Sequence, residues 1–419
     1  MKNRFCFTMA ILAVLWLNGA VQAETDIFRL TNNDYMDILP AVKGDYVVWQ
    51  GYQDGDWEIF LYNIAAAQTT QISNNDYDDI APQTDGNHVV WLGMNARGGN
   101  IFMYDISSSQ ITQVTDNAKI KSWPQVTDGW IVWSDQEVTE SVLPGEIELY
   151  GIADGTTTPI SASVDPDGNL DDIKPLIGNN KVVWTQTGLD STETKHYIHD
   201  LTTGDTFQAP ADFTLDFGPT RSGNLSITTK FDGQDREVFL HHLRLRKDEQ
   251  ITNNSTEEKQ AAIDGNHLVW VEGQGPEQEI YIGITRSLIL VSPGDGVTSQ
   301  KKEYPVFMWE GIGYDRFRVQ FSSSRDFMDN WTTIAFPLPD DAWLSQTSFT
   351  VKRWQALLLN LLSIRHHTLY WRILAQDEDG NEKISQIRSL VMASPKKNKG
   401  QGNMQLIKKI VTMTHNPHN

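Results

Sequence analysis

The sequence predicts an all-β protein in which a six-bladed β-propeller is followed by a small β-sandwich. Three observations support this prediction. A repeat with a spacing of 42 residues between its first copies occurs six times, and each copy holds four short strand signals. One further strand signal precedes the first copy, while the last copy lacks its fourth strand. Four strands in a unit of about 40–45 residues are typical of a propeller blade.

The repeat is clearest in its first two copies, residues 32–40 (NNDYMDILP) and 74–82 (NNDYDDIAP). Each copy has an anchor position, which is a proline in all copies but the last. The anchors are Pro40, Pro82, Pro124, Pro175, Pro219 and Ala261, at spacings of 42, 42, 51, 44 and 42 residues. Nine residues after the anchor the copies carry Trp49, Trp91, Trp133, Trp184, Thr228 and Trp270. The tryptophans follow β-branched or aliphatic pairs, which predicts packing between blades rather than stacking on sugars.

The four strands of each copy follow in a fixed order. The first strand straddles the anchor and ends at a glycine turn, such as Gly44 or Gly86, and the second strand ends at the tryptophan. A loop rich in Asp and Gly leads to the third strand, residues 58–62 in the first copy, and the fourth lies at 69–73. Short β-branched runs separated by Gly, Asp and Asn are signals of β-hairpins.

The ends of the repeat predict how the ring closes. The sixth copy ends after its third strand, residues 279–282, and a strand without a copy of its own precedes the first copy at residues 26–31. Pairing these two strands would complete the sixth blade and cover both exposed edges. The count of strands therefore favours a closed propeller over an open array.

The repeat unit, "Asp-x-x-Pro, Gly turn, Val-Val-Trp, Glu-Ile-x-x-Tyr, Thr-x-x-Ile-Thr", resembles the TolB-like propeller repeat of exported bacterial proteins. The resemblance covers residues 24–286. It implies a six-bladed propeller that binds a protein or another ligand. The fifth copy departs from the pattern because it lacks the tryptophan, and the sixth because it lacks the proline.

Residues 1–23 have the pattern of a secretory signal peptide. Lys2 and Arg4 precede an apolar run from Phe5 to Leu17, and small residues surround the expected cleavage site at Ala23. We expect the mature protein to be periplasmic or secreted, with no transmembrane segment after cleavage. The single cysteine, Cys6, lies within the signal, so we expect no disulfide in the mature chain.

After the propeller, residues 287–393 lose the repeat period but keep alternating strand patterns. Residues 305–309 (Pro-x-Phe-x-Trp) and 370–372 (Tyr-Trp-Arg) resemble bacterial fibronectin type III-like modules of the immunoglobulin-like sandwich class. Leucines at helical spacing between Trp354 and Leu362 predict one short helix packed on this sandwich. Residues 394–419 are rich in lysine with little to bury, which predicts a disordered basic tail.

The charge balance excludes some partners. The formal net charge is −20, and it becomes −22 once Lys2 and Arg4 leave with the signal peptide. An acidic chain of this kind is not expected to bind nucleic acid or an anionic membrane surface. The acidity is compatible with cation binding, although solubility alone also explains it.

Carboxylates at equivalent positions of the repeat are the first candidate metal ligands. Four copies place an aspartate three residues before the anchor, namely Asp37, Asp79, Asp172 and Asp216. Lys121 and Glu258 hold this place in the other two copies. Because the first strand of each blade lines the channel, these carboxylates could form a ring that holds a cation. The alternative is that they cap the bend before the strand.

A longer loop between the third and fourth copies offers a second candidate. Its ligand candidates alternate along the chain: Asp165, Asp167, Asn169 and Asp171. Oxygen ligands at alternate positions suit calcium, but the loop lacks the glycine and glutamate of an EF-hand. The alternative is a solvated acidic loop. Calcium is the ion that both candidate sites favour, because neither contains His or Cys.

No catalytic motif stands out in the sequence. It contains no zinc-like histidine spacing, no Gly-x-Ser-x-Gly elbow and no phosphate-binding loop. We therefore expect a non-catalytic binding or scaffold protein, whose propeller surface or channel mouth binds an envelope or extracellular protein. The alternative is a propeller enzyme acting on polysaccharide, such as a lyase, which a histidine, a basic residue and a metal at the channel mouth would favour.

Overall fold

The computed structural model describes residues 24–95, 98–127, 129–138, 142–164, 170–188, 194–210, 213–215, 217–299, 304–327, 333–337, 342–363, 367–377 and 380–392. The expected signal peptide and basic tail lie outside these residues. The chain forms two compact units, Thr25–Arg286 and a second unit that begins at Ser287.

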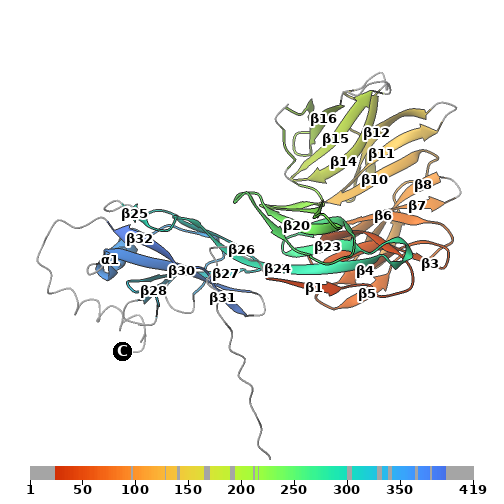
Figure 1. The fold of residues 1–419 in the computed structure, drawn as a ribbon. Coiled ribbons are helices and arrows are strands. Elements are labelled where there is room, and N and C mark those ends of the chain that lie inside the picture. The colour runs from red at the N-terminus through yellow and green to blue at the C-terminus, as the bar shows by residue number, and fades with distance from the viewer. Residues whose placement is uncertain are drawn as a thin grey trace, which may run out of the picture. The chain divides into compact units, whose positions relative to one another are not determined.

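The first unit is built from repeated antiparallel sheets of four strands, as the sequence predicts (Figure 1). Blade 1 contains β2 (Asp37–Lys43), β3 (Tyr46–Gln53), β4 (Asp56–Asn63) and β5 (Gln68–Gln71). Blade 2 contains β6 (Asp79–Thr84), β7 (His88–Asn95), β8 (Gly98–Asp105) and β9 (Gln110–Gln113). Blade 3 contains β10 (Ile120–Thr127), β11 (Trp130–Val138), β12 (Val142–Gly151) and β13 (Thr156–Pro159).

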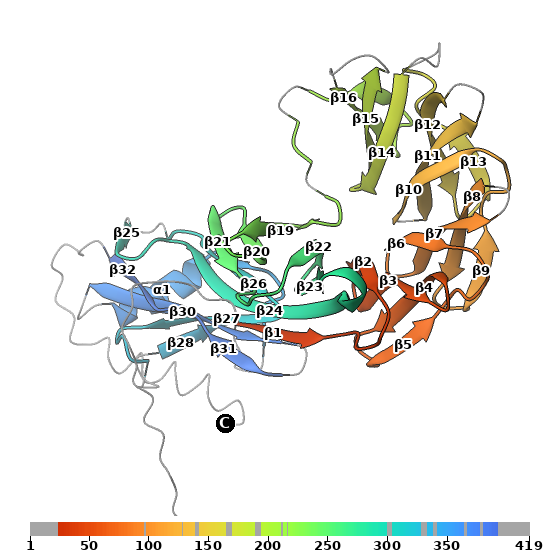
Figure 2. The same cartoon turned by 45° about the vertical axis from the view of Figure 1, so that its right-hand side comes forward.

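The next two blades repeat the same order. Blade 4 contains β14 (Leu170–Gly178), β15 (Lys181–Gly188), β16 (Thr194–Asp200) and β17 (Thr206–Gln208). Blade 5 contains β18 (Arg221–Ser222), β19 (Leu225–Phe231), β20 (Arg236–His242) and β21 (Lys247–Gln250). Its inner strand β18 is only two residues long, in the copy that lacks the tryptophan. Figure 2 shows blades 1 to 4 following one another in chain order.

The sixth blade combines both ends of the propeller sequence. It contains β22 (Glu258–Asp264), β23 (His267–Glu272) and the first part of β24 (Glu279–Ser292), with the 3-10 helix η1 (Gly275–Glu277) between β23 and β24. The strand β1 (Glu24–Arg29) pairs with β24 and supplies the fourth strand. The Thr31 hydroxyl accepts a hydrogen bond from the Ile280 N–H at 2.8 Å. The predicted closing strand is therefore present.

The apolar cores of this unit lie between neighbouring blades rather than within them. One cluster joins Trp49 and Phe60 of blade 1 to Val269 and Ile280 of blade 6. Further clusters join blade 1 to blade 2, blade 2 to blade 3, and blade 3 to blade 4. The repeat tryptophans of the first four blades each belong to one of these clusters and are at most 2% exposed. The prediction that they pack between blades is confirmed.

Every long inner strand carries the same irregularity just before the anchor. In blades 1, 2, 3, 4 and 6 the pairing register shifts at this point, which marks a β-bulge. The residue before the anchor has a left-handed backbone in each case: Leu39, Ala81, Trp123, Lys174 and Gln260, with φ between 54° and 57°. Side-chain amides of neighbouring blades satisfy two of these bulges, since Gln260 accepts from the Leu39 N–H and Gln50 from the Ala81 N–H.

The second unit contains two sheets that share one apolar core. One sheet has the second part of β24, β26 (Phe307–Ile312) and β29 (Ser348–Phe349). The other contains β25 (Val297–Ser299), β27 (Arg316–Ser322), β28 (Thr333–Phe336), β30 (Thr368–Gln376), β31 (Glu382–Ile384) and β32 (Arg388–Met392). The fibronectin type III-like character of this unit stays a prediction.

The predicted helix is α1 (Arg353–Leu362). Its Leu359 and Leu362 lie in the shared core with Trp309 and Trp371, so this face packs on the sheets as expected. Leu357, which the helical spacing also assigned to the packed face, lies on the opposite face and is 63% exposed, so that part of the prediction is wrong. Within the described part of the chain, no helix has the length and hydropathy needed to cross a membrane.

Candidate functional site

The repeated aspartates hold the repeated tryptophans in place. Asp37 Oδ1 accepts a hydrogen bond from the Trp49 indole N–H at 2.9 Å. The same bond joins Asp79 to Trp91 at 2.9 Å. The hairpin makes this bond possible, because β2 and β3 bring residues 12 positions apart to opposite strands.

The same bond occurs in blade 4, where Asp172 accepts from the Trp184 indole N–H at 2.8 Å. The aspartates of blades 1, 2 and 4 are 0%, 1% and 1% exposed, so they are buried within their blades. Burial raises the pKa of Asp37 and of Asp79 to about 6, while hydrogen bonds from the nearby asparagine and tryptophan act in the opposite direction.

An asparagine four residues earlier completes the network in three blades. Asn33 Nδ2 donates to Asp37 and Asn75 Nδ2 donates to Asp79, at 2.7 and 2.6 Å. The Asn75 backbone N–H also donates to Glu58 of the preceding blade, at 2.8 Å. The Asn33 N–H donates in the same way to Glu279 of blade 6, so in these blades the motif connects a blade to its neighbour. In blade 6, Asn254 donates in the same way to Glu258, at 2.7 Å.

Blade 3 shows what happens when the aspartate is replaced. Lys121 occupies the position and donates to the backbone oxygens of Asn117 and Lys119, at 3.0 and 2.8 Å. An ammonium group cannot accept a hydrogen bond. Accordingly, the Trp133 indole N–H has no hydrogen-bond partner among the described residues, although Trp133 is 1% exposed.

The predicted metal ligands are not brought together in the described part of the chain. Asp37, Asp79 and Asp172 each lie in a separate blade and bond a tryptophan there, and Asp216 lies outside the described residues. In the acidic loop, Asp165, Asp167 and Asn169 also lie outside them. Asp171 Oδ1 accepts a hydrogen bond from the Gly145 N–H of blade 3 at 2.7 Å. Metal binding by these residues stays a prediction.

A cavity of about 470 Å³ lies where the inner strands of all six blades end. Each blade contributes to its lining: Lys43, Gln83, Asp85, Gln125, Asn179, Arg221 and Asp264 are among the polar lining residues. Lys43 forms an ion pair with Asp264 at 2.9 Å, across the junction of blades 1 and 6. No histidine is among the lining residues that the structure describes. The cavity is thus polar, with charges of both signs.

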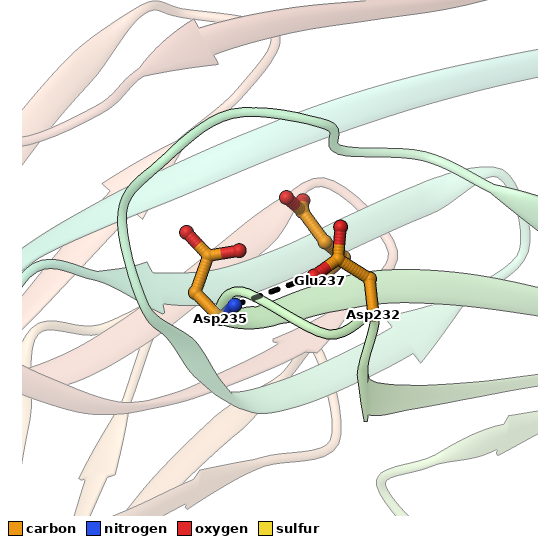
Figure 3. Close-up of side chains that lie close together, drawn as sticks. All are labelled: Asp232, Asp235 and Glu237. Atoms are coloured by element: carbon orange, nitrogen blue, oxygen red, sulfur yellow. Dashed lines mark hydrogen bonds between the residues drawn. The ribbon is translucent and has the colours of Figure 1, made fainter.

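One acidic group was not predicted from the sequence. Among the described residues, Asp232, Asp235 and Glu237 form the one group of three that could share a metal ion, with ligand atoms within 4.8 Å of one another (Figure 3). They lie at the turn between β19 and β20 of blade 5. The signal in the sequence is Asp-Gly-Gln-Asp-Arg-Glu at residues 232–237, with three carboxylates in six residues.

No family model matches the chain, and no curated protein matches it. Among solved structures, TolB from Acinetobacter baumannii aligns with a TM-score of 0.39 and 14% identity, over 55% of this chain and 58% of that chain. The β-propeller domain of the Trilobed protease from Pyrococcus furiosus aligns with a TM-score of 0.34 and 12% identity, over 67% and 91%.

An oligogalacturonate lyase in complex with manganese aligns with a TM-score of 0.34 and 10% identity, over 63% of this chain and 96% of that chain. This chain therefore spans less than two thirds of the TolB structure and nearly all of the lyase structure. With identities of 14% or less, these similarities carry no information on activity. The all-β propeller fold is established by the strand pairing described above.

Proposed function

We propose that the protein is an exported, non-catalytic binding or scaffold protein whose channel mouth binds a segment of an envelope or extracellular protein. The observation that supports this proposal is the cavity of about 470 Å³ to which all six blades contribute. Its side-chain amides at Gln83, Gln125 and Asn179 offer both donors and acceptors, which suit the peptide groups of a polypeptide.

Two charged groups at this cavity have partners within the protein. Lys43 is paired with Asp264, and Asp85 accepts a hydrogen bond from the His88 N–H at 2.7 Å. The alternative, an enzyme acting on polysaccharide, calls for a histidine at the channel beside a basic residue. The described lining includes Lys43 and Arg221 but no histidine, and the imidazole to be tested is that of His88, whose Nδ1 lies 3.3 Å from the lining residue Asp85.

A capture experiment tests the proposal. The mature protein, residues 24–419, is immobilised and exposed to envelope extract, and the captured proteins are cross-linked and identified by mass spectrometry. Gln83→Arg with Gln125→Arg narrows the cavity and adds two charges. The matched control, Thr70→Arg with Thr112→Arg, adds the same charges to the exposed outer strands β5 and β9.

We expect the wild type and the control to capture the same specific protein and the channel variant to lose at least about 90% of it. That loss corresponds to about 1.4 kcal/mol of binding free energy. Equal capture by all three proteins would place binding elsewhere on the molecule.

A further inference from the structure

The turn between β19 and β20 brings three carboxylates to one place in blade 5 (Figure 3). Asp232 closes the turn, because its N–H donates to the Asp235 carbonyl at 3.0 Å. The Asp232 carboxylate accepts the Gln234 and Asp235 N–H groups at 2.8 and 3.3 Å. Asp235 then immediately precedes β20, and Glu237 is the second residue of that strand.

Two of these carboxylates are buried without the partners that buried charges normally have. Asp235 is 7% exposed, and neither of its carboxylate oxygens has a hydrogen-bond partner in the part of the chain that the structure describes. Glu237 is 0% exposed, and its Oε2 has none either, while Oε1 accepts the Asn254 N–H at 2.9 Å. Buried polar atoms are nearly always paired, so these three oxygens indicate a missing partner.

The equivalent position of blade 1 shows how the repeat satisfies a glutamate without a metal. Glu58 Oε1 accepts the Asn75 N–H at 2.8 Å, as Glu237 accepts that of Asn254. Its Oε2 accepts the Ser73 hydroxyl at 2.5 Å, a contact that Glu237 Oε2 lacks. The equivalent Glu279 of blade 6 accepts the Asn33 N–H and likewise leaves its Oε2 without a hydrogen-bond partner among the described residues. What sets blade 5 apart is therefore Asp235, whose two unpartnered oxygens lie beside such a glutamate.

Among the described residues, no basic side chain forms an ion pair with Asp232, Asp235 or Glu237. The adjacent Arg236 turns to Glu257, with its Nε 3.6 Å from the Glu257 carboxylate, and it is half exposed. The remaining charges around Asp235 are those of Asp232, Glu237 and Glu257, which are all negative. Like charges in a buried site repel unless a cation lies between them.

We propose that Asp232, Asp235 and Glu237 bind a calcium ion. Calcium takes oxygen ligands at about 2.3–2.6 Å, so its ligand atoms lie up to about 5 Å apart. The three carboxylates fall within this limit, at 4.8 Å or less. The group contains no nitrogen or sulfur ligand, which favours calcium over zinc or copper.

The site lies where blade 5 meets blade 6. Asn254 joins Glu237 to Glu258 of β22, through its N–H on one side and its Nδ2 at 2.7 Å on the other. The Glu258 Oε2 is also buried, and no described residue forms a hydrogen bond with it. An ion bound at Asp232, Asp235 and Glu237 therefore stabilises the blade junction through this shared asparagine.

The test compares melting temperature with and without calcium. The mature protein is freed of metal with EDTA, dialysed, and melted with no added ion, with 1 mM Ca²⁺ and with 1 mM Mg²⁺. Calcium that binds only the folded state should raise Tm by about 5 °C, and Mg²⁺ should raise it less, because it binds such carboxylate sites with several retained waters. Isothermal titration calorimetry should give one calcium ion for each chain.

Variants assign the effect to the site. Asp235→Asn with Glu237→Gln removes two buried charges, so without calcium this variant should melt at or above the wild-type temperature, and calcium should no longer shift it. The matched control, Asp56→Asn with Glu58→Gln at the equivalent positions of blade 1, should keep the calcium shift. The double variants Asp79→Asn with Asp172→Asn and Asp165→Asn with Asp167→Asn should also keep the calcium-induced rise in Tm.

Two results would overturn the proposal. The first is a wild-type Tm that calcium leaves unchanged while lowering the pH to 5 raises it, which would show that the carboxylates share a proton instead. The second is a calcium shift that persists in Asp235→Asn with Glu237→Gln, which would assign the ion to another site.

Discussion

At the scale of single residues, the Asp–Trp hydrogen bond is the unit that the repeat preserves. A buried carboxylate needs donors, and a buried indole N–H needs an acceptor. Asp79 and Trp91 satisfy each other at 2.9 Å, and Asn75 adds a second donor to the carboxylate. The aspartate that we considered as a metal ligand thus has a structural role in its own blade.

The indole bond can be measured with a matched pair of variants. Trp91→Phe removes ring volume and leaves the Asp79 carboxylate without its indole donor. Trp133→Phe removes the same volume from an equally buried tryptophan whose N–H has no partner among the described residues. We expect Trp91→Phe to cost about 1.5–3 kcal/mol more free energy of unfolding than Trp133→Phe, measured by urea denaturation. Equal losses would mean that the bond contributes nothing.

The burial of Asp79 makes stability depend on pH. Because burial raises its pKa from 3.8 to about 6, the folded state binds the proton more tightly than the unfolded state does. The free energy of unfolding should therefore fall as the pH rises from about 4 through 6. When the pH is lowered from 7.5 to 4.5, the free energy of unfolding of the wild type should increase by about 2 kcal/mol relative to that of Asp79→Asn. Urea denaturation of both proteins at the two pH values measures this difference. Parallel pH profiles of the two proteins would contradict this.

At the scale of elements, the inner strands and the closing strand determine how the blades join. The bulge before the anchor of blades 1, 2, 3, 4 and 6 interrupts the alternation of side chains, so the two halves of these inner strands present different faces. The second strand of blade 2 is also restricted in the residue type that it can carry. At Gly93 of β7 a Cβ atom would lie 2.7 Å from the Phe102 ring and 2.8 Å from the Asp79 carboxylate, so the stacked ring and the buried acid require glycine there.

The closing strand β1 gives the prediction at this scale. Deleting residues 24–33 removes the pairing with β24, the Thr31 bond to Ile280 and the ion pair between Arg29 and Glu279. We expect a lower Tm and self-association through the exposed edge of β24. Thermal melting and light scattering check this. Arg286→Gln, which removes an exposed ion pair with Asp26 and leaves β1 in place, is the control and should behave like the wild type. A deleted protein that melts as the wild type does and stays monomeric would show that β1 is dispensable.

At the scale of the whole molecule, the cores between blades give the propeller its stability, while the ends of the inner strands form its cavity. Each core needs two neighbouring blades, as Trp91 of blade 2 packs with Val48 of blade 1. A single blade could not bury this surface alone, which is the physical basis of a repeat architecture. The second unit has its own core around Trp309 and Trp371.

The sequence by itself determined the blade count, the four strands of each blade, the tryptophan positions and the closing strand. These features follow from local patterns that recur at a fixed spacing, and a pattern that is weak in one copy can be recognised when it occurs six times. Only the tertiary structure decided which side chains meet. Asp37 bonds a tryptophan because the hairpin and its bulge turn it into the blade, and Asp232, Asp235 and Glu237 converge because of one turn. Burial and the direction of a side chain depend on contacts between blades, which a pattern along one chain does not contain.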